Sequence, residues 1–265
     1  MFDAGDRGAA GGGAGGVAGW TVVRRAAADL RAARVAAACS RAAAAGIADL
    51  APGAGLAVLL QDVVLGSVSS GRVLDVVVAA ERLVAWAQSR QAEAVAELAR
   101  RPEMTPQPGP PPGRAVPLDA ADVTAAEIAP ALRISQPAAA SRVAVCRTLV
   151  DLLPGTMTAL RAGRLDWHRT RLVVDAVVPV AAEAAAAAAR AGTDAAGQQA
   201  AERETALAVE ARVLDRAPDQ TPTRLRRALS KAVIAVDPGA AERRRARAVE
   251  ERRAWFIPSP TRWPN

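Results

Sequence analysis

The chain has 265 residues, of which 51% are hydrophobic and 3% aromatic, and alanine supplies much of the hydrophobic share. A core that relies on Ala, Val and Leu favours helix over sheet. Thirty-four basic residues against 27 acidic ones give a net charge of +7, which points to a polyanionic partner, but GC-rich codon usage, which enriches Ala, Arg, Gly and Pro together, explains that charge equally well.

Cys39 and Cys146 lie far apart and belong to no CxxC or Cys/His cluster, so we expect two reduced thiols. The N-terminus is acidic and glycine-rich, where a signal peptide needs a basic start and an apolar run. Apolar stretches such as 56–65 are too short to cross a bilayer, and longer ones are broken by charges. We therefore expect a cytoplasmic protein that has no membrane partner.

Residues 1–19 consist mostly of Gly and Ala without periodicity, which predicts a disordered tail. Residues 20–101 are expected to form the N-terminal helices. The first of these is an Ala- and Arg-rich helix from Trp20 to about Ala45, which ends near Gly46.

A long helix is predicted from Ser70 to Arg101, because apolar residues recur there in steps of four and three. Gln91 interrupts this stripe. We expect the stripe to pack within the chain, with a dimer seam as the alternative. The stripe consists of Val73, Val77, Ala80, Val84, Ala87, Ala94 and Leu98.

Seven prolines between Pro102 and Pro117 predict a stiff linker over residues 102–118. A helical core is expected over 119–257, followed by a short tail over 258–265. Within the core, three helix starts carry an N-cap signal: Asp166, whose helix should end before Pro179, Thr221-Pro222 and Asp237-Pro238.

Residues 124–143 have the spacing of a helix-turn-helix. Arg133 stands where the turn usually has glycine, and Pro130 should kink or shorten the first helix. A packing unit within a helical bundle is the alternative interpretation. The pattern predicts that Ser135 caps the second helix. It also predicts that the apolar residues face the interior: Ile128, Leu132, Ile134, Ala139 and Val143. It leaves four candidate DNA contacts, Gln136, Ser141, Arg142 and Arg147.

Residues 224–253 contain ten basic and four acidic residues. Such a segment either grips phosphates or forms a solvated helix face. Its candidate phosphate contacts are Arg224, Arg226, Arg227, Arg243, Arg244 and Arg245.

His168 is the only histidine of the chain, and neither cysteine stands at a metal-ligand spacing from it. We expect it in the first turn of a helix, in a structural or exposed position. No nucleotide-binding, nucleophile-elbow or metal-binding motif is present in the sequence. We therefore predict no catalytic centre, no cofactor and no metal.

Three segments, Val77–Arg101, Ala126–Val178 and Thr221–Trp255, resemble the DUF222 family, also called the 13E12 repeat family. The most specific pieces are the run Leu-Pro…Leu…Ala-Gly-Arg-Leu and the run Thr-Pro…Leu-Arg…Asp-Pro…Ala…Arg-Arg…Glu-Arg-Arg…Trp. The resemblance implies an all-α fold and a DNA-related or mobile-element role, commonly upstream of an HNH endonuclease domain.

An HNH site needs two histidines and an orienting asparagine, and the single His168 lies far upstream of the expected position. We therefore expect an all-α multi-helix bundle, with a long N-terminal helix and a helix-turn-helix-like segment, that associates with DNA without cleaving it. The alternatives are an oligomerisation scaffold that uses the apolar stripe over 73–98 and a truncated remnant of an endonuclease.

Overall fold

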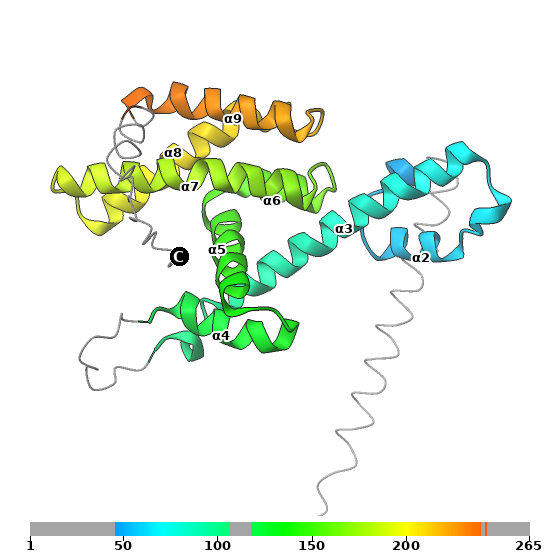
Figure 1. Cartoon of the computed structure of the whole chain (residues 1–265), viewed down its shortest axis with the longest axis horizontal. Coiled ribbons are helices and arrows are strands. Elements are labelled where there is room, and N and C mark those ends of the chain that lie inside the picture. The colour runs from blue at the N-terminus through cyan, green and yellow to red at the C-terminus, as the bar shows by residue number, and fades with distance from the viewer. Residues whose placement is uncertain (1–45, 107–117, 240–241, 243–265) are drawn as a thin grey trace, which may run out of the picture. The chain divides into compact units, whose positions relative to one another are not determined.

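The computed structural model describes residues 46–106, 118–239 and 242, and these contain eight α-helices, three short 3-10 helices and no strand (Figure 1). The all-α prediction is confirmed. The chain divides into two compact units, residues 1–83 and 84–265. Several predictions lie outside the described residues: the N-terminal tail, the helix over 20–45 with Cys39, most of the linker, and the segment from 243 onward.

The first unit has a small apolar core. Ile47, Leu56 and Ala79 are buried in it, and partly buried leucines of α2 pack around them. The guanidinium of Arg82 donates a hydrogen bond to the carbonyl of Ala48 and so ties α3 to the first turn. The described elements of this unit are η1 (Ile47–Asp49), α2 (Ala54–Asp62), η2 (Leu65–Ser67) and the first part of α3 (Ser70–Leu98).

The long helix α3 forms as predicted, but it buries a different face. The predicted apolar stripe over 73–98 is called the α3 seam below. Its Val77 and Val84 are 52% and 51% exposed, so the prediction that the seam packs within the chain is wrong. Small side chains permit a closer approach of neighbouring helices than valines do, and the buried face of α3 consists mostly of small residues. The buried residues of α3 are Ala79, Ala85, Ser89, Ala92, Val95 and Ala96.

The second unit has a continuous core that α3 shares with all the later helices. α7 and α8 form a hairpin and α9 packs on both of them, while α5 packs on α4, α6 and α7 (Figure 1). The elements that follow α3 are η3 (Pro102–Met104), α4 (Ala120–Leu132), α5 (Gln136–Leu152), α6 (Pro154–Arg161), α7 (Trp167–Arg190), α8 (Ala195–Val213) and α9 (Pro222–Val236).

Helix α7 begins at its predicted cap, where the Asp166 carboxylate accepts from the Arg169 N–H at 2.7 Å, but it does not end before Pro179. A proline in a helix interior costs about 3 kcal/mol. The burial of Val173, Val177 and other valines on both sides of Pro179 offsets that cost, and α7 continues to Arg190.

By length and composition alone, α7 is apolar enough to cross a membrane, and α5 with α6 would also pass as a span bent by 107°. The expectation that charges break the longer apolar stretches therefore does not hold for α7, in which an 18-residue window contains at most two charged residues. In this structure Val173, Val174, Val177 and Val180 of α7 belong to the core that α7 shares with α8 and α9, whereas Val178 is exposed.

The start of α6 is held by a carboxylate from α8. Glu210 is 5% exposed, and its two oxygens accept hydrogen bonds from the backbone N–H groups of Gly155 at 3.2 Å and Thr156 at 2.6 Å. These N–H groups have no partner within α6, and the positive end of the helix dipole favours a negative charge there. The Leu-Pro-Gly run of the sequence is thus the docking point for α8.

Candidate nucleic-acid interface

The helix-turn-helix prediction is confirmed in its geometry. α4 and α5 are joined by Arg133, Ile134 and Ser135, and the Ser135 hydroxyl caps α5 by accepting from the Ala138 N–H at 3.4 Å. Ala139 and Val143 are fully buried, as predicted. Ile128 and Ile134 also join the core, whereas Leu132 is 40% exposed, so its predicted inward position is wrong.

Arg133 adopts the left-handed conformation that a glycine usually supplies, with φ of 54°. Its N–H donates to the Pro130 carbonyl at 3.2 Å, and the Ile134 N–H donates to the Ala129 carbonyl at 3.0 Å. This pair of bonds is a Schellman motif, which satisfies the last carbonyls of α4. Pro130 lies in that last turn, and α4 continues for two further residues, so the proline does not shorten the helix appreciably.

Two of the four candidate contacts on α5 already form hydrogen bonds with side chains of other helices. The Ser141 hydroxyl accepts from Arg171 of α7 at 3.0 Å, and Arg142 donates to the Gln91 side chain of α3 at 3.4 Å. Gln136 and Arg147 are exposed. Direct readout from α5 would therefore depend on these two, with Gln136 at the N-terminal turn that enters a groove in helix-turn-helix proteins.

Helix α9 separates apolar and basic residues cleanly. It starts at the predicted cap, Thr221, followed by Pro222. One face, with Leu225 and Leu229 among others, is buried. Its 15 residues include four basic and no acidic residues. All four, Arg224, Arg226, Arg227 and Lys231, are exposed, and none forms an ion pair with another described residue.

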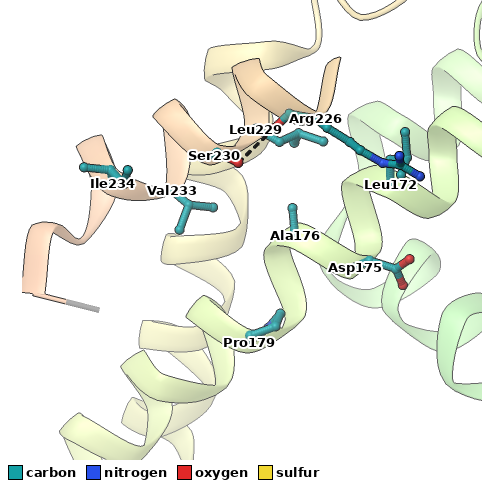
Figure 2. Close-up of a pocket in the computed structure, with 9 residues that line it drawn as sticks. All are labelled: Leu172, Asp175, Ala176, Pro179, Arg226, Leu229, Ser230, Val233 and Ile234. Carbon is teal, nitrogen blue, oxygen red and sulfur yellow. Dashed lines mark hydrogen bonds between the residues drawn. The ribbon is translucent and has the colours of Figure 1, made fainter. Parts of the chain in front are cut away.

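Arg226 points in a different direction from its neighbours. Figure 2 shows it reaching from α9 across a groove toward Leu172 of α7. This groove, of about 600 Å³, is otherwise mostly apolar, and its one carboxylate, Asp175, pairs with Arg171 at 3.6 Å. Arg224, Arg227 and Lys231 follow each other at steps of three and four and so share one side of the helix. We call these three residues the basic face of α9.

Two further cations that were not among the predicted contacts lie near this face. Arg212, at the end of α8, and Arg216, in the turn that follows, line a second groove together with Lys231. No local motif marks Arg212 or Arg216; their spacing of four residues just before the Thr221 cap is the only signal in the sequence. Arg243, Arg244 and Arg245 lie outside the described residues.

The predicted contacts do not form one surface. α9 packs on α7 and α8, whereas α4 packs on α5, and Figure 1 shows α5 and α7 between α4 and α9.

His168 is exposed in the first turn of α7, as predicted, and the described residues hold no group of three His, Cys, Asp or Glu that could bind a metal. Comparison with protein-family models, curated proteins and solved structures finds no match to this chain.

Proposed function

We propose that this chain is a non-catalytic, cytoplasmic, helical protein that binds duplex DNA through its phosphates, chiefly by the basic face of α9. The observation that carries the proposal is the charge of α9: four exposed basic residues, no acidic one and no ion pair to another described residue. The sequence resemblance to the DUF222 family, with its DNA-related role, supports the same proposal.

The placement of charge argues against codon usage as its whole cause. Biased codons would scatter arginine along the chain, and in α3 three basic residues do alternate with four acidic ones. Seven of the fourteen described arginines elsewhere in the second unit pair with carboxylates, as Arg100 does with Asp151 and Arg161 with Glu93. The arginines of α9 have no such partner among the described residues, so a phosphate bound there displaces no ion pair within that part of the chain.

A salt titration tests the proposal. A labelled duplex should bind the full chain at about 50 mM salt and lose affinity steeply toward 200 mM, because phosphate contacts release counterions. Arg224→Ala with Arg227→Ala should weaken binding at least about tenfold and reduce the salt slope by about 2. Failure of the unmodified chain to retain duplex at low salt would contradict the proposal.

The matched control removes the same charge elsewhere. Arg101 and Arg190 are each 59% exposed, and each pairs with a carboxylate, Glu97 at 3.0 Å and Glu183 at 2.9 Å. Arg101→Ala with Arg190→Ala should change the affinity less than about twofold. An equal loss in both double variants would show that net charge, rather than the basic face of α9, holds the duplex.

The helix-turn-helix is tested separately. Gln136→Ala with Arg147→Ala is the informative pair, because both side chains are exposed, whereas Arg142→Ala also breaks the contact with Gln91. If α5 reads bases, the pair should reduce discrimination between duplex sequences, since glutamine can bond the edge of adenine. If α4 and α5 are only a packing unit, sequence preference should not change.

Self-association through the α3 seam is a second candidate function. Val77 and Val84 are half exposed at positions whose spacing lets two identical helices pair. Val77→Glu with Val84→Glu should then convert a dimer to a monomer in sedimentation. Val178→Glu, at an exposed valine of α7, is the matched control. A concentration-independent monomer of the unmodified chain would reject this function.

A further inference from the structure

The end of α8 and the outer side of α9 enclose a groove of about 310 Å³. Among the described residues, its lining contains three cationic side chains, Arg212, Arg216 and Lys231, and no acidic residue. Asp215 and Asp219 occupy the same turn region but do not line it. We call this surface the α8/α9 groove.

The three cations reach the groove from the end of α8, the turn that follows it, and α9. Arg212 lies in the last turn of α8 and Arg216 three residues beyond its end, both near the C-terminus of the helix, where the helix dipole stabilises positive charge. Arg212 donates one bond to the Ala208 carbonyl of its own helix at 2.9 Å, which leaves its other N–H groups for a ligand. Lys231 comes from α9, one turn beyond Arg227 on the basic face. The groove therefore extends that face onto α8.

The remaining lining restricts the kind of ligand. Apart from Gln220, it consists of alanines and one valine, which let an anionic chain approach closely. The Gln220 side-chain oxygen is buried and has no hydrogen-bond partner in the described structure; a bound water would supply the donor that this acceptor lacks. A helix that binds a membrane surface presents large apolar side chains beside its basic ones, and this lining contains none.

We infer that the α8/α9 groove is a phosphate-binding site, with Arg212, Arg216 and Lys231 as the contacting residues, and that the phosphates it takes are those of a nucleic-acid backbone. The identity of the polyanion rests on the proposed function. The phosphate chemistry rests on the groove alone, and the two are tested separately.

The first experiment uses inorganic tripolyphosphate and the full chain. Calorimetry should show binding, and NMR should show shifts at the side-chain N–H signals of Arg212 and Arg216. Arg216→Ala with Lys231→Ala should weaken this binding at least fivefold, whereas Arg101→Ala with Arg190→Ala should change it less than twofold. Because Arg216 and Lys231 are both exposed, circular dichroism should show an intact fold. Absent binding, or equal binding by the groove variant, overturns the phosphate site whatever duplex DNA does.

The second experiment uses duplex DNA and, separately, vesicles of phosphatidylglycerol and phosphatidylcholine. The groove variant should lose duplex affinity at least tenfold, and its salt slope should fall by about 2. Duplex binding that the groove variant leaves unchanged overturns the inference while the proposed function stands. Tripolyphosphate binding without duplex binding refutes the proposed function and the nucleic-acid assignment together. Vesicle binding that depends on Arg216 and Lys231, without duplex binding, assigns the groove to a lipid headgroup and overturns the inference.

Discussion

The carboxylate of Glu210 in α8 accepts a hydrogen bond from the backbone N–H of Thr156 at the start of α6 over 2.6 Å. It also accepts from Gly155, so one buried carboxylate serves two N–H groups that have no partner in their own helix. Glu210→Ala should lower the free energy of unfolding by about 2–3 kcal/mol, because it leaves both groups buried without an acceptor. Urea titration measures this loss.

Glu204→Ala is the control for Glu210→Ala. It removes a carboxylate from an exposed position on the same helix. Surface substitutions of this kind change the free energy of unfolding by no more than about 0.5 kcal/mol. Equal effects of the two variants would mean that Glu210 contributes through the charge of α8 and not through its bonds to α6.

Gly155 lies close to side chains from the end of α8. A Cβ atom at this position would lie 2.6 Å from Leu214 Cδ2 and 3.0 Å from Glu210 Oε2. Gly155→Ala should therefore destabilise the protein by about 1–3 kcal/mol, as expected for overpacking. Adding Leu214→Ala should recover part of the loss, which a thermodynamic cycle from urea titrations detects. In contrast, Gly71→Ala in α3 meets no atom within 4 Å and should stabilise the chain by up to about 1 kcal/mol.

The elements that the sequence predicted correctly depend on neighbours in the chain. The Ser135, Asp166 and Thr221 caps are local, since each bonds an N–H three residues ahead. The spacing of Ala139 and Val143 likewise predicted the buried side of α5. Capping and periodicity are properties of short windows, so a single sequence contains them.

What the sequence could not predict depends on partners that are distant in the chain. Glu210 reads as one more charge on a surface helix until α6 is placed against it, 54 residues away in sequence. Arg212 and Lys231 meet only because α8 packs against α9. Which face of α3 is buried also depends on the neighbouring helices: the small Ala92 and Ser89 are buried against them, whereas Val84 is exposed.

Arg133 is the position where a glycine should improve the fold. A non-glycine residue in the left-handed region costs about 1 kcal/mol, and Gly163 and Gly192 take that conformation after α6 and α7. Arg133→Gly should raise the free energy of unfolding by about 0.5–1 kcal/mol in urea titrations. Arg133→Ala removes the same charge while keeping a Cβ, and should not stabilise. A gain in both variants would attribute the effect to charge.

Cys146 should report on opening of the core. It is 1% exposed, and burial raises the pKa of its thiol from 9.0 to about 11, with Arg142 opposing the shift. In a Cys39→Ser background, the thiolate fraction at pH 8 should be about 100-fold smaller than in the unfolded chain. Iodoacetamide should therefore label Cys146 at least that much more slowly in buffer than in urea, as mass spectrometry can measure. Rapid labelling in buffer would show that the second unit opens readily around α5.

The same thiol makes stability depend on pH in a defined direction. The unfolded chain releases this proton near pH 9 and the folded chain near pH 11, so the contribution is complete below pH 9 and is lost as the pH rises toward 11. Two pKa units correspond to about 2–3 kcal/mol at most. In the same Cys39→Ser background, urea titrations from pH 8 to 11 should show a decline that Cys146→Ala makes shallower, although that variant starts from a lower stability because of its small cavity. An identical slope in both chains would mean that other groups govern alkaline unfolding.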